Sequence, residues 1–256
     1  MRYNVNGDKM IKKINDVNIN YITYGNEKGE DVVFLHGWGQ NIQMMRPLGD
    51  LLARDYHITI LDLPGFGESD EPKYAWTVYE YAECVKQLLS SLGIRKPILV
   101  GHSFGGKISL LYASMYDTNK LVLLAPTYKK EVTKLSFKTK VLKSLKKVPV
   151  LNHLEGFAKK HIGSTDYRNA SPTMREILTR HVNTDISEEC KKIMCPSLII
   201  WGTNDEAVPY VRAHQLEDLI RNAGVVTYEG CTHYAYLERL HQTVNVLYSF
   251  FGSKGE

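Results

Sequence analysis

The sequence is poor in cysteine and has no long apolar run, and each absence excludes a class of protein. Four cysteines occur among 256 residues, without paired spacing. They are Cys84, Cys190, Cys195 and Cys231. A disulfide framework or a zinc knuckle is therefore not expected, and reduced thiols in a cytosolic protein are the simpler interpretation. No apolar run reaches the roughly 18 residues of a membrane span, and the N-terminus lacks the apolar segment of a signal peptide. These absences predict a cytoplasmic protein.

The chain also lacks a strong charge imbalance and the common metal and nucleotide motifs. Its net charge is +4, with 43% hydrophobic and 23% charged residues. This balance does not indicate nucleic-acid binding. Neither H-E-x-x-H nor a Walker A motif occurs, so we expect neither a metal nor a cofactor. The length suits one α/β domain with an insertion, or two small domains.

Two kinds of strand pattern are present. Residues 17–25 alternate between apolar and polar side chains, as a half-buried strand does, and residues 9–15 are the expected partner. Farther along, the apolar runs are continuous, which is typical of strands buried on both faces of a parallel sheet. These runs lie at residues 31–37, 57–65, 97–103, 121–126, 196–202 and 224–230.

Helical patterns separate these runs. The clearest covers residues 77–92, where Thr77 and Glu80 form a capping box ahead of an apolar stripe. Further helices are expected near residues 47–54, 105–116, 209–222 and 240–251. Strands that alternate with helices predict an α/β fold, with a mostly parallel sheet and helices on both faces. Ligands of such folds bind beyond the carboxyl ends of the strands.

One segment interrupts the alternation. Residues 127–190 contain no convincing strand, and helices are expected at 132–148, 151–161 and 171–183. We interpret this segment as an all-helical lid inserted into the sheet domain. The predicted core then comprises residues 1–126 and 191–256.

A serine stands between glycines directly after the strand predicted at 97–103. Gly101-His102-Ser103-Phe104-Gly105 fits G-x-S-x-G and precedes a predicted helix. A sharp strand-to-helix turn exposes the serine hydroxyl and needs small neighbours, because Cβ atoms would clash where the chain doubles back. The pattern therefore predicts that Ser103 is a nucleophile, which needs a base.

With this motif in this context, the chain resembles the α/β-hydrolase superfamily. The resemblance implies a fixed order of nucleophile, acid and histidine along the chain. Asp205 follows the strand predicted at 196–202, and His233 follows the one at 224–230. We expect Asp205 to orient His233, with Glu206 and Glu238 as rival acids.

The resemblance extends to residues 36–40, His-Gly-Trp-Gly-Gln, which follow the first long apolar run. In the superfamily such a loop binds the oxyanion. It implies that the backbone N–H groups of Trp38 and Phe104 form the oxyanion hole. Gly37 and His102, which flank these positions, are expected to contact the substrate.

Two positions depart from the superfamily pattern. Thr232 precedes His233 where glycine is common, and a β-branched residue disfavours positive φ. Leu240 replaces the usual proline after the Leu-Glu-Arg stretch. Neither change removes a catalytic group, but the first predicts a histidine loop of different geometry.

The predicted lid is rich in lysine. Residues 127–161 hold ten lysines and two glutamates, a balance of +8. A lid helix with its lysines in water explains this pattern most simply. The alternatives are weak contact with an anionic membrane surface and steering of acidic substrates.

Taken together, the sequence predicts a cofactor-independent serine hydrolase for a small to medium acyl substrate, most simply a carboxylic ester. Thioester hydrolysis, C–C bond hydrolysis and perhydrolysis use the same triad and stay open. A non-catalytic ligand sensor on the same fold is the alternative from another class. No motif predicts the oligomeric state.

Overall fold

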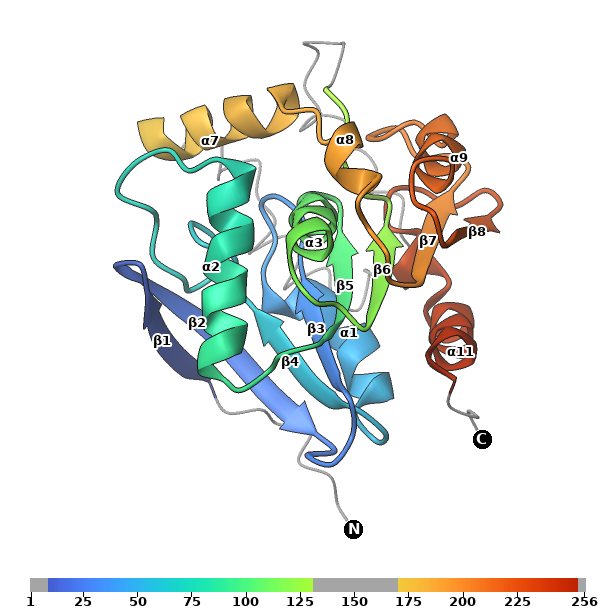
Figure 1. Cartoon of the computed structure of the whole chain (residues 1–256), viewed down its shortest axis with the longest axis horizontal. Coiled ribbons are helices and arrows are strands. Elements are labelled where there is room, and N and C mark those ends of the chain that lie inside the picture. Colours follow the sequence, from blue (N-terminus) through green and yellow to red (C-terminus); the bar gives the residue numbers. More distant parts are fainter. Residues whose placement is uncertain (1–8, 131–169, 253–256) are drawn as a thin grey trace.

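The computed structural model describes residues 9–130 and 170–252. Its eight strands form one sheet in the order β1-β2-β4-β3-β5-β6-β7-β8 (Figure 1). Every strand predicted from the sequence is present. The strands are β1 (Met10–Ile14), β2 (Val17–Gly25), β3 (Asp31–Leu35), β4 (His57–Leu61), β5 (Ile98–His102), β6 (Lys120–Leu124), β7 (Ser197–Gly202) and β8 (Ala223–Tyr228).

The sheet is mostly parallel, as predicted. Strand β2 runs antiparallel to its neighbours β1 and β4, and every other pair of neighbours is parallel. Strands β5 and β6 are buried between helices, which is why their sequences are continuous apolar runs. Strands β3, β5, β7 and β8 run in the same direction, so the loops that follow them all start at the carboxyl ends of the parallel strands. The candidate site is built from these loops.

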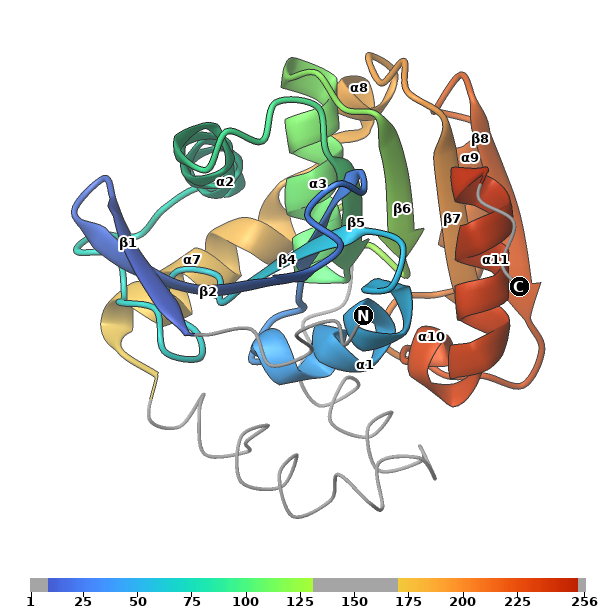
Figure 2. The same ribbon diagram turned by 90° about the horizontal axis from the view of Figure 1, so that it is seen from below.

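Helices cover both faces of the sheet (Figure 2). Buried side chains of α2 and α3 belong to one apolar core, and those of α1 and α11 belong to a second core on the opposite face. The helices of the described residues are α1 (Ile42–Leu52), α2 (Val78–Ser91), α3 (Phe104–Met115), α7 (Pro172–Asn183), α8 (Ser187–Cys190), α9 (Val211–Glu217), α10 (Ala235–Glu238) and α11 (Leu240–Phe251).

Local capping signals decide where two of these helices begin. The capping box of Thr77 and Glu80 is present at the start of α2, as predicted. Helix α1 begins at residue 42, five residues before the predicted range. The Asn41 side chain accepts from the Gln43 N–H at 3.0 Å, and Asp62 from the next chain segment accepts from the Ile42 N–H at 2.7 Å. The second contact depends on the fold and could not be seen in the local sequence.

Between β6 and β7, the described residues contain helices α7 and α8 and no strand. The helix predicted over residues 171–183 is confirmed as α7. The helices predicted at 132–148 and 151–161, and most of the lysine-rich segment, lie outside the described residues. The division into core and lid therefore stays a prediction, as does any contact with a membrane surface. No helix within residues 9–130 and 170–252 has the length and apolar character needed to cross a bilayer.

Candidate active site

Ser103 occupies a strained turn between β5 and α3. Its φ is 52° and its ψ is −109°, a conformation that residues other than glycine rarely adopt. The turn is held from three sides: the Ser103 N–H donates to Leu124 O at 3.0 Å, and its carbonyl accepts from the N–H groups of Lys107 and Thr127 at 3.1 and 3.2 Å. Strain that the surroundings maintain in this way is characteristic of functional sites. The strand-to-helix turn predicted from the sequence is present.

The glycines around Ser103 let three segments approach closely. A Cβ atom on Gly101 would lie 2.4 Å from Ser109 Oγ, and one on Gly105 would lie 2.3 Å from Leu35 O. One on Gly106 would lie 2.7 Å from Pro126 Cβ. The steric reason given for small residues at positions 101 and 105 therefore holds, and the contact partners include backbone atoms that cannot move aside.

We expect Gly105→Ala to destabilise the fold by about 3 kcal/mol, because the new methyl group would overlap the carbonyl oxygens of Leu35 and His36. Urea unfolding measures this change. Gly224→Ala is the matched control: Gly224 lies in β8, and nothing lies within 4 Å of a Cβ atom there. The control should change stability by no more than about 1 kcal/mol. Equal stability of the two variants would refute the steric argument.

His233 and Asp205 form a buried pair. Asp205 Oδ2 lies 2.7 Å from His233 Nδ1, and both side chains are fully buried. The second carboxylate oxygen, Oδ1, accepts from the N–H groups of Ala207 and Val208 at 2.8 Å each. These two donors fix the orientation of the carboxylate. The carboxylate in turn accepts the Nδ1 proton, so Nε2 is the basic atom of neutral His233.

The structure places the two other predicted acids, Glu206 and Glu238, in different surroundings. Glu238 Oε1 accepts from the Thr232 N–H at 2.9 Å and from its hydroxyl at 2.5 Å, while Glu206 is exposed. Asp205 is the predicted acid whose carboxylate lies at hydrogen-bond distance from His233 Nδ1.

The two departures from the superfamily pattern leave the histidine loop intact. Thr232 does not have a positive φ, the conformation that a β-branched residue disfavours. Instead, Gly230 takes the left-handed conformation with φ 74°, and Glu238 holds Thr232. Leu240 simply begins α11.

The predicted oxyanion loop lies against the start of α3. The Gly105 N–H donates to His36 O at 3.1 Å, and the rings of Trp38 and Phe104 pack with centroids 5.3 Å apart. Phe104 is the first residue of α3, so the helix provides no acceptor for its N–H group. Neither Trp38 nor Phe104 has an acceptor for its N–H among residues 9–130 and 170–252. Both groups are therefore suited to bind an anion at the positive end of the helix.

Gly37 and His102, predicted as substrate contacts, lie in a buried network under the site. His102 Nε2 lies 3.1 Å from His233 O, and Nδ1 lies 3.3 Å from Gln40 Oε1. The Gly37 N–H donates to the same Gln40 oxygen at 3.0 Å. Gln40 Nε2 donates to the Tyr234 hydroxyl at 3.1 Å. Because both ring nitrogens of His102 face protein atoms, the structure gives no support to a substrate contact there. It indicates that His102 positions the backbone of His233.

Burial keeps three histidines neutral. Desolvation lowers the pKa of His36, and it lowers the pKa of His102 and His181 well below the ordinary value. At His181 the nearby Lys107 charge adds to the effect. The contacts of His36 suit the neutral form: Nδ1 donates to Gly37 O at 2.8 Å, and Nε2 accepts from the Leu63 N–H at 2.9 Å.

We therefore expect stability to fall as the pH drops below about 6.5. The unfolded chain binds protons at these three histidines near the ordinary pKa of 6.5, whereas the folded chain binds them only at lower pH. Each histidine then removes about 1.4 kcal/mol per pH unit until the pH reaches its folded pKa. Urea unfolding at pH 7.5 and 5.5 measures the loss. A pH-independent midpoint would contradict the expectation.

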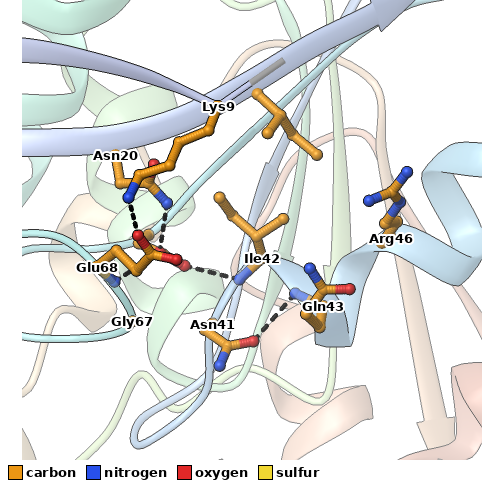
Figure 3. Close-up of a pocket in the computed structure, with 10 residues that line it drawn as sticks. Lys9, Asn20, Asn41, Ile42, Gln43, Arg46, Gly67 and Glu68 are labelled. Carbon is orange, nitrogen blue, oxygen red and sulfur yellow. Dashed lines mark hydrogen bonds and ion pairs between the residues drawn. The ribbon is translucent and has the colours of Figure 1, made fainter. Parts of the chain in front are cut away.

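A separate pocket of about 280 Å³ lies beside the start of α1 (Figure 3). Asp62 Oδ1 accepts there from the Ile42 N–H, and Oδ2 accepts from Asn20 Nδ2 at 2.7 Å. Lys9 pairs with Glu68 at the rim. None of the candidate catalytic residues lines this pocket. We interpret this pocket as a gap left where β2, α1 and the loop that follows β4 pack together. In the part of the chain that the structure describes, no three His, Cys, Asp or Glu side chains gather as metal ligands would.

Three residues near Ser103 were not predicted from the sequence. His181 of α7 packs on Trp38 and Phe104, Lys107 of α3 binds the end of α7, and Thr127 lies between Ser103 and His181. No motif marks them, because they meet only when α7 folds onto α3.

Comparisons with known proteins identify related hydrolases. Residues 32–142 match the family model described as alpha/beta hydrolase fold, and residues 168–255 match the one described as TAP-like protein. The chain is 26% identical to the AB hydrolase superfamily protein YisY of Bacillus subtilis, over 88% of this chain and 92% of that protein. It is 26% identical to Lipase 3 of Moraxella sp., over 93% and 80% of the two chains. A serine hydrolase involved in carbazole degradation, the CarC enzyme, has a similar fold, with a TM-score of 0.82, 23% identity and coverage of 96% and 99%.

Proposed function

The chain belongs to the α/β-hydrolase superfamily and is a hydrolase, and from this premise we propose that it cleaves a carboxylic ester through an acyl-enzyme formed on Ser103. The observation that carries the proposal is the combination of a strained Ser103 with the buried Asp205–His233 pair. The similarity to a protein named Lipase 3 supports an ester as the substrate class.

The first half of the reaction forms the acyl-enzyme. Ser103 Oγ attacks the ester carbonyl while His233 Nε2 accepts its proton. Asp205 stabilises the imidazolium that results, and the N–H groups of Trp38 and Phe104 stabilise the oxyanion. When the tetrahedral intermediate collapses, the C–O bond breaks and the proton moves from His233 to the leaving alcohol.

The second half releases the acid. Water takes the place of the alcohol and gives a proton to His233 as it attacks the acyl carbon. The proton then returns to Ser103 Oγ, and the carboxylic acid leaves. No step requires a redox group or a metal. His102 contributes indirectly, since its Nε2–H donates to the backbone oxygen of His233 and holds the loop that carries the base.

The testing experiment is hydrolysis of p-nitrophenyl esters, from acetyl to palmitoyl, by the wild-type chain and by Ser103→Ala. Hydrolysis that disappears in the variant supports the proposal. The same two chains can be tested on thioesters, on C–C substrates and in perhydrolysis, which remain the alternatives with this triad. A ligand sensor would show no turnover with any of these substrates and no labelling of Ser103 by a fluorophosphonate.

A further inference from the structure

Helix α7 lies beyond the top of α2 in Figure 1, on the side of the molecule toward which β5 and β6 point. It belongs to the connection between β6 and β7, and its last turn reaches the candidate site. The residue that enters the site is His181, which is only 1% exposed. A residue from this connection therefore forms part of the wall around Ser103.

The ring of His181 packs against both residues of the proposed oxyanion hole. It stacks on Trp38 with ring centroids 6.2 Å apart and an interplanar angle of 3°. It meets the Phe104 ring edge-on, with centroids 4.6 Å apart. Its Nε2 lies 3.4 Å from Thr127 Oγ1, and that hydroxyl lies 3.4 Å from Ser103 O. The imidazole is thus linked to the turn at Ser103 through aromatic packing and through Thr127.

Lys107 holds His181 in this place. The Lys107 side chain is fully buried, and its Nζ donates to His181 O at 2.8 Å and to Thr184 O at 2.7 Å. These carbonyls belong to the end of α7, where a cation is favoured, and His181 O also accepts from the Thr184 N–H at 3.4 Å. The backbone N–H of Lys107 also donates to Ser103 O. One residue therefore ties the end of α7 to the candidate nucleophile.

The position of His181 relative to Ser103 determines which part of an ester substrate His181 can contact. The leaving alcohol must lie near His233, because it receives its proton from Nε2. His233 follows β8, whereas Trp38 follows β3, and these strands lie on opposite sides of β5 in the sheet. In the proposed reaction the acyl group is therefore directed away from His233, toward the side of Ser103 on which Trp38 and His181 pack together. The low pKa of His181 keeps this wall uncharged, as an apolar acyl chain requires.

We propose that His181 is a specificity-determining residue that limits the length of the acyl group, and that Lys107 is its positioning residue. The proposal rests on the ester hydrolysis proposed above. Truncation of the imidazole would open space beside Trp38 and Phe104, and the helix end that carries it would stay bound to Lys107.

The test compares kcat/KM of His181→Ala and wild type on p-nitrophenyl acetate and octanoate. We expect the ratio of octanoate to acetate to rise by about tenfold or more, since methylene-sized changes in a pocket alter discrimination by at least that factor. His181→Phe restores a ring and should keep the ratio within about threefold of wild type. Lys107→Met should raise the ratio as His181→Ala does, to a smaller extent. His214→Ala, an exposed histidine of α9, is the control.

Labelling of Ser103 measures the same pocket without turnover. Intact-protein mass spectrometry measures the labelling rates with ethyl and dodecyl fluorophosphonates. The ratio of the dodecyl rate to the ethyl rate should rise in His181→Ala and stay at the wild-type value in His181→Phe. Unchanged ratios in an enzyme that hydrolyses esters would overturn the role of His181 and leave the proposed function standing. Labelling of Ser103 without ester hydrolysis would overturn the proposed function. The ratio of the dodecyl to the ethyl labelling rate would then still test whether His181 limits the length of the acyl group. A wild-type chain that is not labelled at all would refute both.

Discussion

Replacing Ser103 by alanine is expected to lower kcat for ester hydrolysis by about 10⁴- to 10⁶-fold. The variant lacks the oxygen that forms the acyl-enzyme, so only oxyanion binding and substrate positioning remain. The backbone contacts of the turn use the N–H and the carbonyl of residue 103, and alanine retains both. Steady-state hydrolysis of p-nitrophenyl acetate measures the loss, and circular dichroism checks that the fold is intact.

Ser114→Ala is the matched control for this experiment. Ser114 lies on the same helix α3, where its hydroxyl donates to Leu111 O at 2.8 Å and takes no part in the site. Its activity should stay within about twofold of wild type. A Ser103→Ala chain that retains more than a tenth of the wild-type rate would exclude Ser103 as the nucleophile.

The Asp205→Asn variant is expected to lower kcat by about 10⁴-fold while the fold stays intact. The amide oxygen of asparagine can keep the bonds from the N–H groups of Ala207 and Val208. The amide NH₂ then faces His233 Nδ1, 2.7 Å away in the wild type. A donor there stabilises the tautomer with the proton on Nε2, the atom that must act as the base. Hydrolysis rates together with chemical unfolding separate this loss of function from a loss of stability.

Glu206→Gln controls for the removal of a charge from the same loop. Glu206 is exposed and adjacent to Asp205, so its neutralisation should change kcat by less than about twofold. Loss of activity in Glu206→Gln, with Asp205→Asn near the wild-type rate, would transfer the acid role to Glu206. If only Glu238→Gln lost activity, the result would indicate that activity depends on the contact between Glu238 and Thr232 in the histidine loop.

Much of this architecture was predictable because its signals are local in the sequence. Continuous apolar runs predicted the buried strands, since a strand covered on both faces needs apolar side chains at every position. The Thr77–Glu80 capping box predicted the start of α2, because its partners are three residues apart. The glycines at 101 and 105 predicted the sharp turn at Ser103. In each case the atoms that decide the structure belong to one short segment.

The rest depended on contacts between segments far apart in the chain. Asp205 contacts His233, 28 residues away, whereas Glu238 contacts Thr232. The place of His102 beneath the site was decided by the carbonyl of His233, 131 residues away. The entry of His181 into the site was decided by Lys107, 74 residues away, in a bond to a helix-end carbonyl. These contacts cannot be predicted from the local sequence. The residues that make them are far apart in the chain, and they meet only when the folded sheet places its loops together at the carboxyl ends of the strands.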